Sequence, residues 1–349
     1  MSVDKNPITT GVIVGCGSIG KKYLGVMMQR YETILIVDTD INYVNELNQL
    51  TNSKIIAFTE IDKMIFNKLF NPINLVAVIS NWGPDHYATY MKLAKHGVQR
   101  IIIEKPLVTS IKLAQEISSH AAINNVKLIS AMPRRYSQFY ENIKLELIEE
   151  SLGNPILMTM TGGAQCIATN GIHWLDLACQ LFESFPQTVF AKIKNSSINP
   201  RNKKLGFYEG NTTWFFPEFK QLTINLTNNS YYRAEITIIC EFGAIVIDNS
   251  GDVRMHKLSN NIQDIKNSPI TRVLGTNLSK KIILGPIKDP ILEQIRAAEG
   301  LQEPKYSLEE SIKVLIALIS AFESSENNVP IDINSPKEIQ ELDKVWNFS

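Results

Sequence analysis

The sequence predicts an N-terminal α/β domain with a parallel sheet, followed by an α+β domain with a large, mainly antiparallel open sheet. Up to about residue 130, short β-branched runs alternate with helix-compatible stretches, as in right-handed βαβ units. Beyond residue 150, strand-like segments follow one another with few helices between them, which favours antiparallel pairing. We therefore expect a first domain at 1–133 and a second at 134–349, with C-terminal helices within 307–346 that pack back on the first domain.

The first half contains six strand-like runs, and helix-compatible stretches follow most of them. TGVIVG precedes KKYLGVMMQRY, and TILIVD precedes INYVNELNQL. KIIAF, LVAVIS, QRIIIE and VKLISA continue the series, with HYATYMKLAKH and IKLAQEISSHAAINN as intervening helices. The three isoleucines at 101–103 predict a strand buried on both faces, as is usual in a parallel sheet.

The second half begins with a helix-like segment at 171–183. A helical region is expected at 307–324 and a short tail helix near 336–346. Between them, turn-rich links separate strand candidates at 187–194, 212–217, 220–227, 231–240, 243–248 and 252–257.

Composition narrows the class of protein. Lys+Arg and Asp+Glu both total 35 in 349 residues, so there is no net field to recruit nucleic acid or an anionic membrane. The four cysteines are scattered without CxxC pairing, which argues against a zinc site and a disulfide framework. The N-terminus has no signal pattern, and the longest apolar runs are far shorter than a membrane span. We expect a cytoplasmic protein without a metal site.

A glycine fingerprint follows the first strand. Gly15, Gly17 and Gly20 have G-x-G-x-x-G spacing at the start of a helix, where glycines let the backbone approach a pyrophosphate. Asp38 ends the second strand, at the distance where a carboxylate accepts hydrogen bonds from both ribose hydroxyls. No arginine follows Asp38 to meet a 2′-phosphate, which favours NAD over NADP. The alternative is a structural glycine turn with an Asp that caps the next helix. We prefer an NAD-binding Rossmann domain.

Two further strand ends carry polar residues. Glu104, Lys105 and Pro106 directly follow the isoleucine strand, and SNWGPDH at 80–86 follows the preceding strand. A strand that simply reaches solvent would also explain the charges and the proline. Ligands of open parallel sheets, however, bind outside the carboxyl ends of the strands. The predicted cofactor-binding residues are Gly15, Cys16, Gly17, Ser18, Ile19, Gly20, Asp38, Ser80, Asn81, His86, Glu104, Lys105 and Pro106.

Several short motifs together resemble one family. They are the glycines at 15–20, Asp38, the loop near 80–86, EKPL at 104–107, PRRY at 133–136, LGNPILM at 152–158 and GIHWLDL at 171–177. This set resembles the glucose–fructose oxidoreductase / inositol dehydrogenase / rhizopine catabolism (Gfo/Idh/MocA) family of NAD(P)-dependent sugar oxidoreductases.

The resemblance implies that Lys105 reaches the substrate hydroxyl beside the nicotinamide and that the peptide before Pro106 is often cis. Glu104 would then be structural or orienting. Residue chemistry agrees, because oxidising an alcohol removes a hydride and a proton, so a group poised near neutrality must lie near the hydroxyl. Burial and a positively charged nicotinamide would both lower the pKa of the lysine.

A helix opened by Asn170 carries the second predicted group. His173, Asp176 and Gln180 form one polar line, which alone would suggest packing against the dinucleotide domain. The resemblance instead implies that His173 lies near the substrate hydroxyl. Many relatives have an Asp four residues before this His, whereas this chain has Thr169, which can bind a hydroxyl but carries no charge. The predicted catalytic residues are Lys105 and His173, and the predicted substrate-binding residues are Thr169, Asp176 and Arg135.

Arg135 has a second interpretation, as a residue that ties the two domains together. The leading hypothesis is an NAD-dependent oxidoreductase acting on a secondary carbon of a sugar, a sugar derivative such as a nucleotide sugar, or a cyclitol. Alternatives are a non-catalytic NAD- and sugar-binding regulator, favoured by Thr169, and a lyase or hydrolase that uses transient oxidation by retained NAD. The resemblance also implies a homodimer or homotetramer assembled through the strand-rich half.

Overall fold

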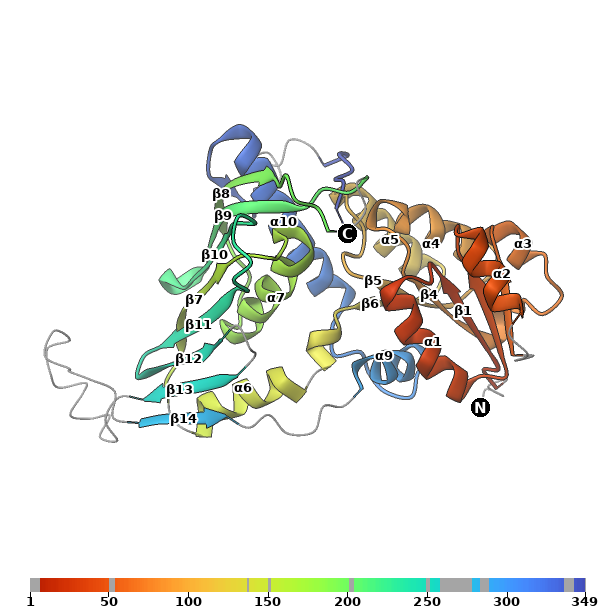
Figure 1. Cartoon of the computed structure of the whole chain (residues 1–349), viewed down its shortest axis with the longest axis horizontal. Helices are drawn as coiled ribbons and strands as arrows, with labels where there is room; N and C mark the ends of the chain where they lie inside the picture. The colour runs from red at the N-terminus through yellow and green to blue at the C-terminus, as the bar shows by residue number, and fades with distance from the viewer. Residues whose placement is uncertain are drawn as a thin grey trace, which may run out of the picture. The chain divides into compact units, whose positions relative to one another are not determined.

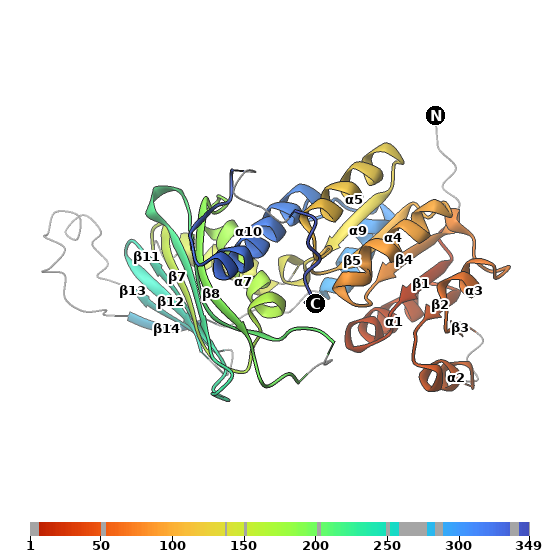
Figure 2. The ribbon, with the colours of Figure 1, turned by 90° about the horizontal axis from the view of Figure 1, so that it is seen from above.

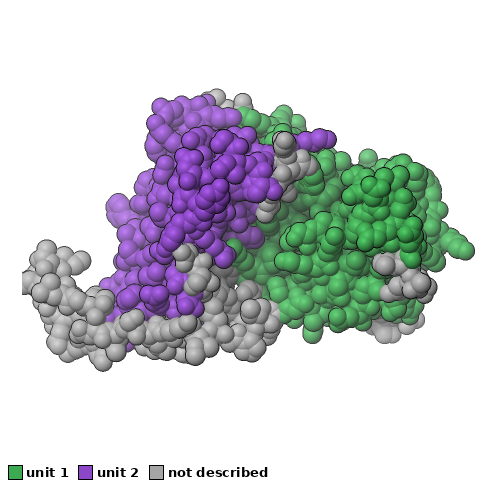
Figure 3. All heavy atoms as spheres, in the orientation of Figure 1, with its two compact units in different colours: residues 1–136, 288–315, 342–349 green, residues 137–287, 316–341 purple. Residues whose placement is uncertain are grey.

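The structure is a computed structural model, shown as a ribbon in Figures 1 and 2. Residue contacts divide it into two compact units, which are described separately below. Unit 1 contains 1–136, 288–315 and 342–349, and unit 2 contains 137–287 and 316–341 (Figure 3). The residues described are 7–49, 54–136, 138–149, 152–200, 204–248, 252–257, 278–282, 289–335 and 342–348.

Unit 1 contains a six-stranded parallel sheet in the order β3-β2-β1-β4-β5-β6, which confirms the predicted Rossmann architecture. All five residues of β1 and of β4 are buried, as expected for central strands covered on both faces. The strands are β1 (Thr10–Val14), β2 (Thr33–Val37), β3 (Ile55–Phe58), β4 (Leu75–Ile79), β5 (Arg100–Glu104) and β6 (Lys127–Ala131).

Helices cover this sheet, and one of them is distant in sequence from the others. α9 was not predicted, although Asp289 caps its N-terminus through bonds to the amides of Ile291 and Leu292, and Gly300 ends it at φ 80°. α9 contacts α1, β5 and β6, so residues beyond 288 complete the first unit. The helices are α1 (Ser18–Arg30), α2 (Ile41–Gln49), α3 (Ile61–Ile65), α4 (His86–Lys95), α5 (Ile111–Ile123) and α9 (Pro290–Glu299).

Unit 2 is built on a nine-stranded sheet in the order β14-β13-β12-β11-β7-β10-β9-β8-β15. Only the β7–β10 pair is parallel among its described neighbours, which confirms a mainly antiparallel sheet. The strands are β7 (Pro155–Gly162), β8 (Thr188–Asn195), β9 (Tyr208–Phe215), β10 (Gln221–Leu226), β11 (Glu235–Cys240), β12 (Gly243–Ile247), β13 (Val253–Lys257), β14 (Leu278–Ile282) and β15 (Ile331–Asp332).

The sequence and structure differ in detail here. β7, β14 and β15 were not predicted as strands. β9 begins at Tyr208 rather than at 212, and β11 begins at Glu235 rather than at 231. β7 lies between β10 and β11, so an unpredicted strand holds the sheet together at its middle.

The two faces of this sheet have different environments. Trp214, Leu222 and Ile238 are fully buried on one face, and the indole of Trp214 donates to the carbonyl of Ala317. α7 (Ile172–Leu181) and the 316–327 part of α10 (Leu308–Asn327) lie on one side of the sheet in Figure 2. On the opposite face Phe190 and Phe215 are exposed by 37% and 44%. This open face carries polar threonines between its apolar residues, as an antiparallel sheet with one uncovered face does.

The helical region expected at 307–324 is α10, which begins at Leu308 and ends at Asn327. The tail helix expected near 336–346 lies partly outside the described residues. Its described part, from residue 342 on, contains no helix. Among the described residues, none of the helices is both long and apolar enough to cross a bilayer.

Candidate functional site

The carboxyl ends of four neighbouring strands bring the predicted cofactor residues of unit 1 to one edge of the sheet. β1 leads into Gly15, β2 into Asp38, β4 into Ser80 and β5 into Lys105. β1 and β4 lie side by side at the centre of the sheet. From this pair the strands follow one another outward in opposite directions, β1-β2-β3 on one side and β4-β5-β6 on the other. Ligands of this fold bind at such a switch point, outside the strand ends.

The glycine loop packs closely against the protein at Gly15 and Gly20 and leaves open space at Gly17. A Cβ atom on Gly15, at φ 87°, would lie 2.5 Å from the amide nitrogen of Asn81, and one on Gly20 would lie 2.2 Å from the carbonyl oxygen of Gly15. Gly17 is exposed, and a Cβ placed on it would meet nothing within 4 Å. α1 has no side-chain N-cap and no acidic residue in its first turn, so Ser18, Ile19 and the following amides suit an anion.

Asp38 is connected to this loop directly. Its Oδ2 atom accepts a hydrogen bond of 2.7 Å from the main-chain amide of Cys16, and its Oδ1 atom accepts one of 3.0 Å from the main-chain amide of Asp40. A carboxylate has acceptor capacity beyond these two bonds, so ribose hydroxyls can still donate to it. Burial raises the pKa of the Cys16 thiol, which keeps this cysteine neutral within the loop. The arrangement therefore fits a dinucleotide.

Ser80 and Asn81 form the opposite wall of the loop. The Ser80 hydroxyl donates to the carbonyl oxygen of Gly15 at 2.7 Å. The Asn81 amide donates to Thr89, while its Oδ1 atom is buried without a hydrogen-bond partner among the described residues. Buried acceptors usually have partners, so this oxygen is suited to a donor from the cofactor.

Glu104 is buried at the end of β5 and is held by residues far away in sequence. Tyr23 Oη lies 3.4 Å from Glu104 Oε1 and 2.5 Å from Gln294 Oε1. The amide of Lys105 donates to Glu104 Oε2 at 3.3 Å. Burial is the main cause that raises the pKa of Glu104, and the neighbouring Lys105 charge opposes it. This geometry suits an orienting residue, which is the role that the resemblance implied for Glu104.

The main chain after Lys105 is fixed by His86. The Lys105–Pro106 peptide is cis, as the resemblance implied. His86 is completely buried, and its Nδ1 atom lies 2.9 Å from the carbonyl oxygen of Pro106 and 3.2 Å from that of Leu107. The Nε2 atom also lies 3.2 Å from a carbonyl oxygen, that of Asn81. Because a neutral imidazole carries one N–H proton, the shorter contact to Pro106 favours the tautomer with the proton on Nδ1. Burial lowers the pKa of His86, which keeps the ring neutral. His86 therefore contacts the Lys105 loop rather than open space.

The end of the chain supports the same segment. The amide of Trp346 donates to the carbonyl oxygen of Thr109, and the Ser110 hydroxyl donates to the carbonyl oxygen of Leu342. Lys112 forms an ion pair of 3.1 Å with Asp343. Residues 342–348 thus brace the chain that leaves Lys105 and Pro106.

Arg135 lies in unit 1 with its guanidinium occupied. Its Nη1 atom is 3.3 Å from Glu310 Oε1, and its guanidinium carbon is 4.8 Å from the centre of the Tyr306 ring. The side chain is 7% exposed. These contacts attach the segment after β6 to residues 306–310 of the same unit.

In unit 2, Thr169 and His173 lie on one continuous helical segment. A π-helical turn (Ile167–Gly171) leads into α7, and π turns occur often at functional sites. Asn170 was predicted to cap α7, but it lies inside this turn, where its Oδ1 atom accepts from the amide of Cys166. Thr169, His173 and Asp176 are all buried, with 1–8% exposure.

Sequence reasoning missed three polar residues near these groups. Tyr23 and Gln294 support Glu104, and only the packing of α1 and α9 shows this. Gln165 precedes the π turn, and its Oε1 atom is buried without a hydrogen-bond partner among the described residues. Such an oxygen can accept from a hydroxyl group. The structure thus brings the unit 1 predictions together at one sheet edge, and separately groups Thr169, His173 and Asp176 on one segment of unit 2.

Comparison with known proteins agrees with this geometry. Residues 10–132 match the Gfo/Idh/MocA family, described as an oxidoreductase family with an NAD-binding Rossmann fold. An Agrobacterium radiobacter oxidoreductase, solved in complex with NAD⁺, L-tartaric acid and magnesium, is 16% identical, with a TM-score of 0.70 over 93% of this chain and 98% of that one.

Two other solved structures have the same fold. The UDP-N-acetylglucosamine 3-dehydrogenase GnnA from Acidithiobacillus ferrooxidans is 13% identical, with a TM-score of 0.65 over 91% of this chain and 98% of that one. The transcriptional regulator Gal80p from Kluyveromyces lactis is 15% identical, with a TM-score of 0.68 over 95% and 92%. Residues 10–132 thus match the model of the Gfo/Idh/MocA oxidoreductase family, with its NAD-binding Rossmann fold, and the solved structures share the fold of the chain, in agreement with the resemblance of the sequence motifs.

Proposed function

We propose that the protein is an NAD-dependent dehydrogenase that transfers a hydride between nicotinamide and a secondary alcohol or ketone carbon. The substrate would be a sugar, a sugar derivative such as a nucleotide sugar, or a cyclitol. The observation that carries this proposal is the Lys105 loop, which Glu104, Tyr23 and His86 hold at the edge of the sheet where the glycine loop lies. The bound nicotinamide would supply the hydride acceptor or donor.

The chain's own residues would bind the cofactor and handle the proton. The amides at the start of α1 would hold the diphosphate, and Asp38 would accept from the adenosine ribose. Lys105 would donate a hydrogen bond to the substrate hydroxyl and stabilise negative charge as that oxygen loses its proton. His173 would exchange the same proton, and Thr169 and Gln165 would orient other hydroxyl groups. A substrate with several hydroxyls suits these neutral polar groups.

A screen of sugars, cyclitols and nucleotide sugars for NADH formation tests this proposal. We expect one class to give turnover with NAD⁺ that Lys105→Met abolishes, while the variant still binds NAD⁺. Mass spectrometry of small molecules that co-purify with the protein narrows the substrate class. Turnover that is unchanged in Lys105→Met would contradict the assignment of this lysine.

A second candidate is a ligand-responsive regulator that keeps the cofactor fold without turnover. Thr169 in place of the expected Asp favours it, and the likeness to Gal80p is compatible with it. This candidate predicts saturable sugar binding that changes no NAD⁺ to NADH. Isothermal titration of the same compounds, run beside the turnover screen, separates the two functions.

A further inference from the structure

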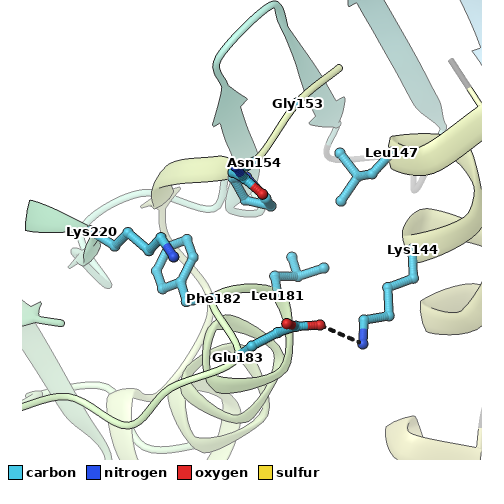
Figure 4. Close-up of a pocket in the computed structure, with 9 residues that line it drawn as sticks. Lys144, Leu147, Gly153, Asn154, Leu181, Phe182, Glu183 and Lys220 are labelled. Carbon is cyan, nitrogen blue, oxygen red and sulfur yellow. Dashed lines mark ion pairs between the residues drawn. The ribbon is translucent and has the colours of Figure 1, made fainter. Parts of the chain in front are cut away.

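Unit 2 contains a cavity of about 340 Å³ that none of the predicted site residues lines. Its walls come from α6 (Gln138–Glu149), the segment before β7, the C-terminal end of α7 and Lys220 (Figure 4). His173 lies at the other end of α7, roughly 12 Å away along the axis at 1.5 Å per residue. The cavity therefore differs from the proposed site of proton transfer. Its volume falls in the range of small-molecule sites.

One side of the cavity is apolar. Leu147, Leu181 and Phe182 are at most 7% exposed. Figure 4 shows Leu147 and Leu181 directed into the same space from α6 and α7. Phe182 is held in place by an edge-to-face contact with Phe216, with ring centroids 4.9 Å apart. These side chains would favour the carbon skeleton of a ligand, because contact with it removes apolar surface from water.

Two lysines give the cavity its charge. The Lys220 side chain is only 18% exposed, and its Nζ atom lies 2.9 Å from the carboxylate of Glu218, which is 76% exposed. Hydrogen bonding to Lys220 lowers the pKa of Glu218, which keeps this carboxylate ionised at neutral pH. The Lys220 ammonium has three N–H donors, so beside its contact with Glu218 it can donate a hydrogen bond to an anion in the cavity.

Lys144 provides the second cation at the opposite wall. It pairs with Glu183 across 3.6 Å, and both side chains are more than half exposed. Such exposed ion pairs contribute little to stability, so Lys144 can turn towards a ligand at small cost. Among the residues that line the cavity, two are cationic and one is anionic, which favours an acid over a base as the ligand.

The cavity wall is shaped by fixed main-chain geometry. Gly153 has a φ of 79°, and a Cβ placed there would lie 2.5 Å from Glu241 Oε2. That carboxylate accepts from both the main-chain and the side-chain amide of Asn154. Glu183 also has a left-handed backbone, at φ 51°, immediately after α7. Glu241 thus holds this part of the main chain in place, so it needs no rearrangement when a ligand binds.

We propose that this cavity binds a small carboxylic acid with an apolar body. The carboxylate lies between Lys220 and Lys144, and the body contacts Leu147, Leu181 and Phe182. Binding here does not depend on dehydrogenase activity, so the outcome of the test below is independent of whether the proposed function is correct.

The test uses 3-phenylpropionate as the probe and uncharged 3-phenylpropionamide as the matched compound. Calorimetry gives the affinity, and leucine methyl spectra report Leu147 and Leu181 directly. We expect saturable binding of the acid with shifts of these methyls, and binding of the amide at least about tenfold weaker, because charged hydrogen bonds are lost.

Lys220→Met removes the charge and keeps an unbranched side chain that is one heavy atom shorter. It should weaken binding of the acid by at least about tenfold, and the exposed Lys144→Met, which does not threaten folding, should weaken it in the same direction. Lys192→Met is the matched control, because Lys192 is exposed on β8 and does not line the cavity. No saturable methyl shifts, equal binding of acid and amide, or unchanged affinity in both folded cavity variants would overturn the proposal.

Discussion

The Nδ1 atom of His86 lies 2.9 Å from the carbonyl oxygen of Pro106, so a buried imidazole at the start of α4 holds the main chain directly after Lys105. His86 was predicted to border the nicotinamide, and in the structure its ring nitrogens contact main-chain carbonyls. We infer that it positions the Lys105 loop.

Replacing His86 by Ala should lower the free energy of unfolding of the protein by about 2–4 kcal/mol, because it leaves a cavity and unpaired buried carbonyls. Burial lowers the pKa of His86 in the folded state, so its stabilising contribution is complete above the unfolded value of about 6.5 and is lost as the pH falls. Urea unfolding at several pH values measures both effects. His96→Ala, at an exposed position, is the control, and an equal loss in both variants would contradict the positioning role.

Glu104→Gln should show the opposite pH dependence. Burial raises the pKa of Glu104, so its contribution is complete below the unfolded value of about 4.3 and is lost as the pH rises through the folded value. As the pH rises above the unfolded value, the free energy of unfolding of the unmutated protein should therefore fall relative to that of the Gln variant. Thermal unfolding across this pH range tests the sign, with the exposed Glu46→Gln as the control. A constant difference would mean that Glu104 ionises freely.

Asp38→Ala should weaken NAD⁺ binding by about tenfold or more and narrow the difference between the affinities for NAD⁺ and NADP⁺, because it removes both the proposed ribose acceptor and the bond to the Cys16 amide. Titration of the two cofactors measures this. Asp40→Ala is a suitable control, since that carboxylate bonds only to amides at the start of α2 among the described contacts. Tighter binding of NADP⁺ than of NAD⁺ by the unmutated protein would refute the proposed preference.

Lys105→Met and His173→Ala should each lower kcat by about 10²–10⁴-fold while NAD⁺ binding stays nearly intact. The double variant should lose less than the product of the two, because groups that share one proton are not additive. Thr169→Asp should shift the pH–rate profile by adding a charge one turn before His173. Steady-state kinetics provide the measurement. Full additivity would show that the two residues act independently.

The open face of the unit 2 sheet should form a subunit interface that gives a dimer or tetramer. Thr223 lies on this face, opposite Thr213 in the register of β9 and β10. Thr223→Arg should dissociate the assembly, because it buries an unpaired charge in the contact. Light scattering at micromolar concentrations measures the mass. If the unmutated protein is a monomer at these concentrations, this prediction is wrong.

The sequence by itself determined the order of the elements in the first domain and the glycine loop. Both depend on local patterns: β-branched runs for strands such as β4, and the spacing of Gly15, Gly17 and Gly20 after β1. The acid at Asp38 and the lysine at 105 could also be placed at the strand ends, because parallel strands share one carboxyl edge. The start of β9 was misplaced, since strand ends have weaker local signals than strand centres.

Tertiary structure alone decided what surrounds these residues. Tyr23 and Gln294 meet although 271 positions separate them, and no sequence pattern links α1 to α9. The role of His86 also depended on packing, because a histidine after a strand can face either a ligand or a neighbouring carbonyl. Hydrophobic periodicity states which residues are buried, but not which distant buried residues become neighbours. Which distant residues become neighbours depends on which packing gives the whole unit its lowest free energy.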